Sequence, residues 1–239
     1  MVNACASRLK TISHAKNKMQ YSLSSRSFHP TNSSDKQSTI EVIERLKPNR
    51  VDWIYTRDKK ILEIYQNLGI PYSLTLNPQV PDSSGYTTKK YRIIDYSGTP
   101  YIAPWMTNWK QKNPYWGCVN NPMFYDLFLK NGHQLARLKP YAILVDDSLF
   151  NIRLKLENKV GCFCEYCELK FETYNNRQSK GSKEVGVLKR NLQNKVLQKN
   201  KKLKKTANQY SEFQKESVIE FLSKWKNELK ILYPKKFKS

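Results

Sequence analysis

The chain has 239 residues, 39% of them hydrophobic and 12% aromatic, which is enough to build one large domain or two small ones. Lys and Arg outnumber Asp and Glu by 42 to 20, a formal net charge of +22. No apolar run approaches the length of about 18 residues that a transmembrane helix needs, and no apolar segment near the N-terminus predicts a secretory signal. Five cysteines in a chain of this length do not make a disulfide scaffold, so we expect a reducing, cytoplasmic compartment and no membrane partner.

Strand and helix signals alternate along the first part of the chain. Residues 1–20 are polar and basic, and we expect a flexible terminus there. A short strand is predicted between Tyr21 and His29. The capping-box pattern of Ser38 to Glu41 predicts the start of a helix that ends at Pro48. Val51 to Tyr55 is rich in β-forming residues and predicts a second strand.

Residues typical of helix ends mark both ends of the next helix, and a strand follows it. Asp58 is predicted to cap the N-terminus of a helix with an apolar stripe. Gly69 follows that helix, at the position where helices commonly end in a left-handed residue. Ile70 to Leu76 predicts a third strand. The long irregular stretch after it is predicted to contain a small hairpin that pairs residues 91–95 with residues 99–103.

A second helix–strand pair precedes the cysteine-rich loop. Asn121 and Pro122 predict an N-cap followed by proline in the first helical turn, and the helix is expected to end at Pro140. Tyr141 to Val145 is the most buried-looking strand of the sequence. After the cysteines, a short helix is predicted from Glu168 to about Tyr174.

The C-terminal part of the chain is strongly basic. Residues 177–239 hold 18 Lys and Arg against 5 Glu, a net charge of +13. Residues 176–210 are interpreted as a basic insertion or linker; phosphate-backbone binding by the run 195–205 is the alternative, but that run lacks interleaved aromatic residues. Ser211 to Gln214 has the capping-box pattern and predicts the start of the last helix, residues 211–234. Its apolar stripe consists of Val218, Phe221, Leu222, Trp225, Leu229 and Leu232.

Alternation of this kind predicts an α/β fold with βαβ units and a parallel sheet. We count four units. In a (β/α)8 barrel, and in an open doubly wound sheet, the ligand lies at the carboxyl ends of the strands. No glycine-rich phosphate loop is present, so nucleotide binding has no support. The polar and aromatic residues expected at strand ends are His29, Tyr55, Arg57, Asn77, Asp146 and Asp147.

Four cysteines form the most specific pattern of the sequence. Cys162, Cys164 and Cys167 have the spacing C-x-C-x-x-C, and Cys118 lies far upstream. Four thiolates suit a tetrahedral metal, and zinc fits best; unligated buried thiols are the alternative. A site closed by four protein ligands is structural, since it leaves no position for substrate or water.

The sequence resembles the TIM-barrel glycoside hydrolase superfamily, most closely the zinc-containing β-galactosidases of glycoside hydrolase family 42 and their relatives. The segments that carry the resemblance are Ile143-Leu-Val-Asp-Asp147, Gly161 to Phe171, and Tyr115-Trp-Gly-Cys118. The resemblance covers about residues 20–175 together with the last helix. It implies that residues 21–175 form the first four βα units of a (β/α)8 barrel. It also implies that the four cysteines, on the loops after the third and fourth strands, hold a structural zinc.

The same resemblance implies a catalytic role at the end of the fourth strand. Such hydrolases carry an Asn-Glu pair there, with the Glu as general acid/base, and Asp146 and Asp147 occupy that place. Asp147 is therefore the acid/base candidate, although Asp is one methylene shorter than Glu. The family's nucleophile lies on a late strand that this sequence does not include. We therefore expect a barrel fragment that is inactive alone, associates with itself or pairs with a complementary half.

Aromatic residues near the strand ends are candidate sugar platforms, with ordinary packing as the alternative. The candidate substrate-binding residues are His29, Trp53, Tyr55, Arg57, Trp105 and Trp109. For Asp146 and Asp147 the alternative is a pair of structural carboxylates that cap a loop or bind nearby cations.

Three functions are thus predicted. The first is a β-galactosidase-like barrel that hydrolyses O-glycosidic bonds. The second is a carbohydrate-binding or structural zinc protein without catalysis. The third, less favoured, is a zinc-stabilised basic protein that binds nucleic acid.

Overall fold

The computed structural model describes residues 22–24, 33–80, 91–107, 115–177, 184–193 and 201–233. Several sequence predictions lie outside the described residues: the terminus 1–20, His29 and Trp109. The side chain of Trp105 also lies outside the description, although its backbone is in a short 3-10 helix, η2 (Pro104–Met106).

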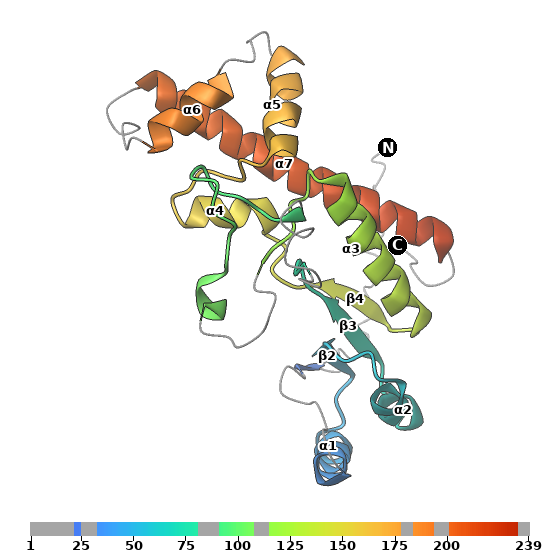
Figure 1. Cartoon of the computed structure of the whole chain (residues 1–239). Helices are drawn as coiled ribbons and strands as arrows, with labels where there is room; N and C mark the ends of the chain where they lie inside the picture. Colours follow the sequence, from blue (N-terminus) through green and yellow to red (C-terminus); the bar gives the residue numbers. More distant parts are fainter. Residues whose placement is uncertain are drawn as a thin grey trace, which may run out of the picture.

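In the described part of the chain, four strands form one parallel sheet in the order β1-β2-β3-β4 (Figure 1). The strands are β1 (Ser22–Ser24), β2 (Arg50–Ile54), β3 (Tyr72–Leu76) and β4 (Ala142–Val145). Helices α1 (Ser33–Leu46), α2 (Lys59–Asn67) and α3 (Pro122–Arg137) lie between successive strands in the chain. Sequential strand order with a helix in each crossover confirms the α/β prediction and is consistent with part of a (β/α)8 barrel.

Two of the predicted helix caps are confirmed. The Asp58 side chain accepts a hydrogen bond from the Lys60 amide at 2.9 Å, and Gly69 beyond the end of α2 has a φ of +64°. The Asn121 side chain accepts from the amides of Met123 and Phe124, with proline in the first turn of α3. Both caps satisfy backbone donors that a helix start leaves unpaired.

The predictions that helices start at the two capping boxes are wrong. Helix α1 begins at Ser33, so Ser38 lies inside the helix instead of at its start. Helix α7 (Lys201–Leu232) begins well before Ser211, whose hydroxyl donates to the Val160 carbonyl at 3.0 Å. The expected basic insertion is accordingly helical in part, because it contains α6 (Glu184–Gln193) and the first turns of α7.

The burial of the strands also differs from the expectation. All five residues of β3 are buried, whereas all four residues of β4 are only half-buried. The reason is their position: β3 lies between β2 and β4, and β4 lies at one edge of the described sheet. Sequence hydrophobicity alone does not distinguish these two positions.

Residues 91–107 and 115–120, between β3 and α3, pack against the cysteine loop. The predicted hairpin is confirmed: the Tyr101 amide donates to the Ile93 carbonyl at 2.9 Å, and the Asp95 amide donates to the Thr99 carbonyl at 3.0 Å. Isolated antiparallel bridges pair Ile102 with Tyr115. After β4 come η3 (Phe150–Ile152), α4 (Arg153–Leu156) and α5 (Glu165–Arg177).

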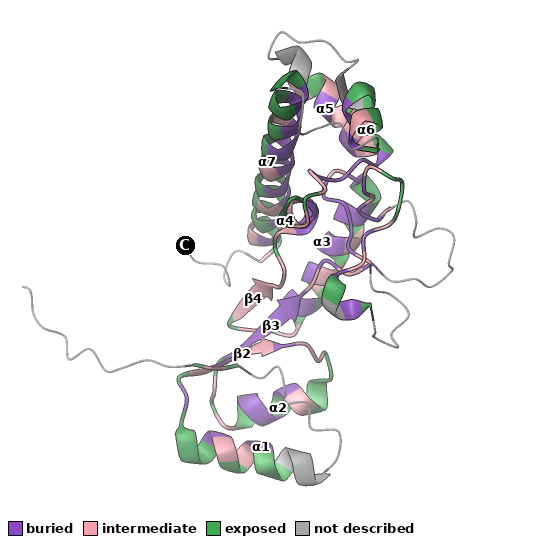
Figure 2. Cartoon of the chain, turned by 90° about the vertical axis from the view of Figure 1, so that its left-hand side faces the viewer, coloured by how far each residue is buried: buried purple, intermediate pink, exposed green. Residues whose placement is uncertain are grey.

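The largest core lies between α3, α7, η3 and the sheet. The ring of Phe221 on α7 lies within 5.2 to 5.6 Å of the rings of Phe124, Phe128 and Phe150. Trp225 is buried beside Phe128, as predicted. Figure 2 shows the buried side of α7 turned toward the rest of the molecule and its other side exposed. Within the described residues, no helix has both the length and the apolar character needed to cross a bilayer.

Candidate functional site

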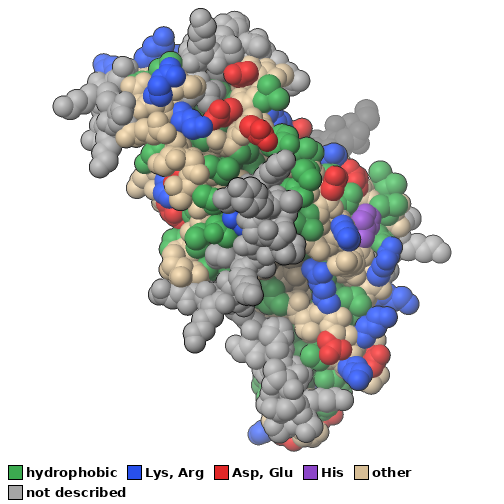
Figure 3. Space-filling view, in the orientation of Figure 1, with side chains coloured by type: hydrophobic (Ala, Val, Ile, Leu, Met, Phe, Trp, Pro, Cys, Tyr) green, Lys and Arg blue, Asp and Glu red, His purple; other side chains and the backbone are tan. Residues whose placement is uncertain are grey.

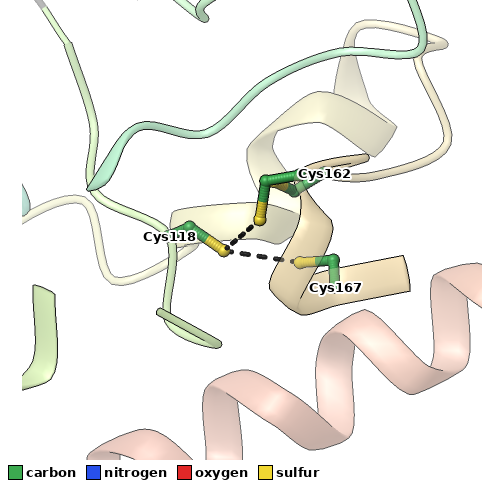
Figure 4. Close-up of side chains that lie close together, drawn as sticks. Cys118, Cys162 and Cys167 are labelled. Atoms are coloured by element: carbon green, nitrogen blue, oxygen red, sulfur yellow. Dashed lines mark hydrogen bonds between the residues drawn. The ribbon is translucent and has the colours of Figure 1, made fainter. Parts of the chain in front are cut away.

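The four predicted ligands meet in one buried cluster. Cys118 comes from the loop before α3, Cys162 and Cys164 come from the loop before α5, and Cys167 lies in the first turn of α5. Their sulfur atoms all lie within 4.8 Å of one another, and every one of the four side chains is buried. Figure 4 shows the labelled thiols of Cys118, Cys162 and Cys167 pointing toward a common centre.

The donor set fits a tetrahedral metal. Zinc–sulfur bonds of about 2.3 Å in a tetrahedron place the sulfurs about 3.8 Å apart. Here the Cys118 sulfur lies 3.4 Å from that of Cys167 and 3.5 Å from that of Cys164. Four sulfur donors at such spacing, without a water-accessible position, suit a closed structural centre. The four cysteines could therefore hold a metal ion, as the sequence predicted.

The thiols are electrostatically coupled. Burial raises the pKa of the Cys118 thiol, but hydrogen bonds from the other three thiols and from Asn151 outweigh it and hold the pKa well below its usual value. Burial, followed by the interaction with Cys118, raises the pKa values of Cys162 and Cys167. A bound cation would favour the ionised form of all four thiols.

Amide donors surround the sulfurs. The Ile94 backbone amide donates to the Cys162 sulfur at 3.4 Å, and the Asn120 side chain donates to the Cys167 sulfur at 3.3 Å. The Asn151 side chain lies 3.3 Å from the Cys118 sulfur and 3.5 Å from the Cys167 sulfur. Sequence reasoning did not find these residues, since Asn has no spacing signature that marks it as a partner of a thiolate.

A second cluster lies at the carboxyl ends of β2 and β4. The Tyr55 hydroxyl donates to Asp146 Oδ2 at 2.5 Å and accepts from the Trp53 indole nitrogen at 2.8 Å. Three of the predicted site residues are therefore joined by direct hydrogen bonds. Asp146 and Tyr55 meet across the end of β3, although 91 positions separate them in the chain.

An irregularity in β2 creates this arrangement. Val51 pairs with Tyr72 and Ile54 pairs with Leu74, so β2 has one residue more than β3 between the two pairs. Trp53 occupies the bulge with a φ of +69°, an unusual conformation for a large side chain. The extra residue keeps both Val51 and Ile54 in the core and directs Tyr55 to the opposite face of the sheet.

The side chain of Asp147 points in a different direction from that of Asp146. Its Oδ2 accepts from the Trp116 indole nitrogen at 2.6 Å, and its Oδ1 lies 3.7 Å from Arg153 Nη2. Its φ is +45°, and its side chain is 10% exposed. Burial raises the pKa of Asp147, although the bond from Trp116 and the charge of Arg153 act in the opposite direction. Asp147 thus contacts the loop that carries Cys118 and helix α4, whereas Asp146 contacts Tyr55 at the end of β2.

Arg57 is turned toward a helix. Its Nη1 donates to the Gln134 side chain on α3 at 2.6 Å, and burial lowers its pKa. The structure therefore joins Trp53, Tyr55 and Asp146, and joins Asp147 to Trp116, but it links Arg57 to α3.

Two surface grooves carry positive charge. One, of about 640 Å³, lies between α5 and α7 and is lined by three lysines and two glutamates, among others: Lys201, Lys204, Lys205, Glu212 and Glu216. The other, of about 630 Å³, lies between α3 and the end of α7 and includes Lys130, His133 and Arg137. Figure 3 shows Lys and Arg side chains gathered over α3.

Comparison with known proteins gives no family. No family model matches the chain, and no curated protein matches it. Among solved structures, a glycoside hydrolase family 31 α-xylosidase from a soil metagenome shares 10% identity over 54% of this chain, with a TM-score of 0.38. A family 31 dextranase from Flavobacterium johnsoniae shares 11% identity over 53% of this chain, with a TM-score of 0.39. α-L-Fucosidase isoenzyme 2 from Paenibacillus thiaminolyticus shares 13% identity over 66%, with a TM-score of 0.42.

These matches involve a small part of each hydrolase. The aligned region spans 21% of the α-xylosidase, 18% of the dextranase and 26% of the fucosidase. Likeness at this level shows no activity, and it does not single out family 42. The fold assignment therefore rests on the order and parallel pairing of the four strands.

Proposed function

We propose that this chain is part of a carbohydrate-active protein of the (β/α) barrel type, with its ligand at the carboxyl ends of β2 and β4. The observation that carries the proposal is the hydrogen-bonded series from Trp53 through Tyr55 to Asp146, beside the pair Trp116–Asp147. Parallel α/β sheets bind ligands at this edge.

The side chains at this edge suit a sugar. Carboxylates accept hydrogen bonds from neighbouring hydroxyl groups, and aromatic rings pack against the apolar face of a pyranose. Asp146 and Trp53 are both half-buried, so neither is sealed in the core. The ligand class follows from this combination of acceptor and ring; the identity of the sugar does not.

For catalysis, the proposal assigns Asp147 as the general acid/base of O-glycoside hydrolysis. A carboxylic acid with a raised pKa retains its proton nearer neutral pH, which a general acid requires. Glycoside hydrolysis also needs a second carboxylate, about 5 Å away in retaining enzymes and about 6.5–9.5 Å away in inverting ones. A second copy of the chain or a complementary barrel half would supply that group.

We assign zinc to the four cysteines. The metal would neutralise thiolate charge and hold the loop that carries Cys118 against the loop that carries Cys162, Cys164 and Cys167. Asp147 contacts Trp116, two positions before Cys118, and Arg153 in α4, the helix that precedes the loop of Cys162. The metal site would thus fix one wall of the proposed sugar site.

A matched pair of variants tests the proposal. Binding of simple β-galactosides and related monosaccharides to the full chain is measured by calorimetry, and hydrolysis is measured with chromogenic glycosides. Asp146→Asn is expected to weaken sugar binding, and Asp147→Asn is expected to retain binding and abolish hydrolysis. Wild-type protein that binds no sugar contradicts the proposal, and sugar binding without any hydrolysis supports the non-catalytic alternative.

The α5–α7 groove favours nucleic acid as the rival partner. Three lysines, Lys201, Lys204 and Lys205, line it together with the ring of Tyr174 and outnumber the two glutamates, Glu212 and Glu216, so its basic side could bind a phosphate backbone. Binding of a fluorescent single-stranded oligonucleotide that weakens steeply with salt, and disappears when these three lysines become glutamate, would favour this rival. Equal changes at Lys224 and Lys226, elsewhere on α7, serve as the control.

A further inference from the structure

Two amide side chains that are not ligands connect the cysteine cluster to α7. Asn151 in η3 is 0% exposed, and Gln214 in α7 is 1% exposed. The Asn151 amide nitrogen donates to Gln214 Oε1 at 2.8 Å. The same nitrogen lies within hydrogen-bond distance of the sulfurs of Cys118 and Cys167.

Both hydrogens of the Asn151 side-chain amide take part in hydrogen bonds. Its amide carries two hydrogens, and one of them points to Gln214. The other is shared by two sulfurs that are themselves 3.4 Å apart. The Asn151 oxygen accepts from the Val119 backbone amide at 3.2 Å, next to the ligand Cys118. Every polar atom of this side chain is therefore used, and the orientation of the amide is fixed.

Helix α7 contacts the ligand loop through consecutive turns of one face. The Tyr210 hydroxyl donates to the Cys162 carbonyl at 2.5 Å, and Gln214 Nε2 donates to the same carbonyl at 3.4 Å. The Ser211 hydroxyl donates to the Val160 carbonyl. Gly161 lies between these two carbonyls, and a Cβ there would come within 2.7 Å of the Gln214 side chain. The loop can approach α7 this closely only with glycine at position 161.

We propose that Asn151 and Gln214 are positioning residues for the metal centre, and that they couple metal binding to the docking of α7. Asn151 stabilises negative charge on two ligand sulfurs, and Gln214 holds Asn151 in the orientation that does so. Because the helix and the loop share these hydrogen bonds, occupancy of the site by a metal stabilises the docked helix. By linkage, the docked helix raises the affinity for metal. The inference rests on the metal assigned to the cysteines above.

Three variants of the full chain separate the roles. Asn151→Leu keeps the shape but removes both donors, and Gln214→Met removes the acceptor that orients Asn151. Gln209→Met, at a half-exposed position on the same helix that lines the α5–α7 groove, is the matched control. Zinc affinity is measured by competition with a chromophoric chelator. We expect the affinity to fall about 10–100-fold in Asn151→Leu, less in Gln214→Met, and not in Gln209→Met.

Cobalt(II) provides a readout that a packing defect alone would not change. Loss of an N–H···S bond raises the energy of the sulfur electrons, so the sulfur-to-cobalt charge-transfer band of Asn151→Leu should move to longer wavelength. The ligand-field bands of a four-sulfur tetrahedral site should remain. Wild-type zinc affinity and an unshifted band in both Asn151→Leu and Gln214→Met would overturn the inference. Failure of the wild-type protein to bind zinc or cobalt would instead refute the metal assignment.

Hydrogen exchange tests the coupling in the wild-type protein, where a folding defect of a variant cannot interfere. On removal of the metal, amides in residues 203–217 of α7 should exchange at least about tenfold faster. Amides of α2, which is far from the cysteines in the chain and packs against the sheet, should keep their rates. Unchanged exchange in α7, or equal acceleration in α2, would contradict the coupling.

Discussion

Trp116 donates its indole hydrogen to Asp147 Oδ2 at 2.6 Å and so joins the loop that carries Cys118 to the end of β4. Trp116 is itself buried, at 4% exposure. The bond links the cysteine cluster to the strand-end cluster, since Cys118 follows Trp116 by two positions. Disturbance of the cysteines is therefore expected to reach Asp147 through a rigid aromatic side chain.

The stability of the protein should depend on the ionisation of Asp147. Burial raises its pKa above the ordinary value of 3.8, so the folded state holds this proton more tightly than the unfolded chain. The free energy of unfolding consequently loses a contribution as pH rises from below the ordinary pKa through the raised one. Asp147→Asn cannot ionise, so its stability relative to wild type should increase across that window and level off above it. Urea denaturation at pH values from about 3 to 7 measures this, and a pH-independent difference would contradict it.

Loss of one cysteine should release the metal. Wild-type protein is expected to contain one zinc per chain, and Cys164→Ser is expected to contain less than half of that. A chelator should lower the Tm of wild type but not of Cys164→Ser, because the variant has no metal to lose. Cys5→Ser is the control and should behave as wild type. Metal analysis and thermal unfolding give the result; full zinc in folded Cys164→Ser would exclude the assigned site.

The aromatic core should be sensitive at Phe221. This side chain is 4% exposed and packs against three other phenylalanine rings, so Phe221→Ala should lower the free energy of unfolding by about 3–5 kcal/mol. Ile219 lies on the same helix but is 64% exposed, and Ile219→Ala should change stability by less than about 0.5 kcal/mol. Chemical denaturation compares the two variants. Similar losses would show that α7 does not present the described face to the core.

The two confirmed helix caps should differ in their contribution to the free energy of unfolding. Asn121 is fully buried and accepts from two backbone amides, whereas Asp58 is exposed and its side chain accepts from one. Asn121→Ala should cost about 2 kcal/mol, near the upper end for an N-cap, and Asp58→Ala about 1 kcal/mol or less. Equilibrium unfolding in urea measures both losses of stability. A larger loss for Asp58→Ala than for Asn121→Ala would contradict the prediction.

Helix caps could be predicted from the sequence where their hydrogen bonds involve only neighbouring residues. The caps at Asp58 and Asn121 are confirmed because their hydrogen bonds involve only the next three residues. Ser38 and Ser211 show the same kind of pattern, yet both lie within helices: Ser38 is exposed on α1, whereas Ser211 and Gln214 are buried on α7. What decides the position of Ser211 is its contact with Val160, 51 positions away, and no local pattern contains that information.

The candidate sites divide in the same way. Cys162, Cys164 and Cys167 could be grouped from their spacing, because metal coordination restricts both residue type and number, and the family resemblance adds Cys118 to them. Asn151 and Gln214 could not be found, since an amide that supports a ligand has no preferred spacing from it. Opposite directions for the adjacent Asp146 and Asp147 are expected from strand alternation, but the left-handed backbone of Asp147 could not be predicted, because no glycine marks it.

The bulge in β2 makes position 53 an extra residue that the register of the sheet does not need. Val51 and Ile54 pair with Tyr72 and Leu74, which are two positions apart, so deletion of Trp53 would leave a regular strand with both side chains still in the core. Tyr55 would keep its direction toward Asp146 and would lose only the hydrogen bond from Trp53. We therefore expect related sequences that lack a residue at position 53 to retain the contact between Tyr55 and Asp146.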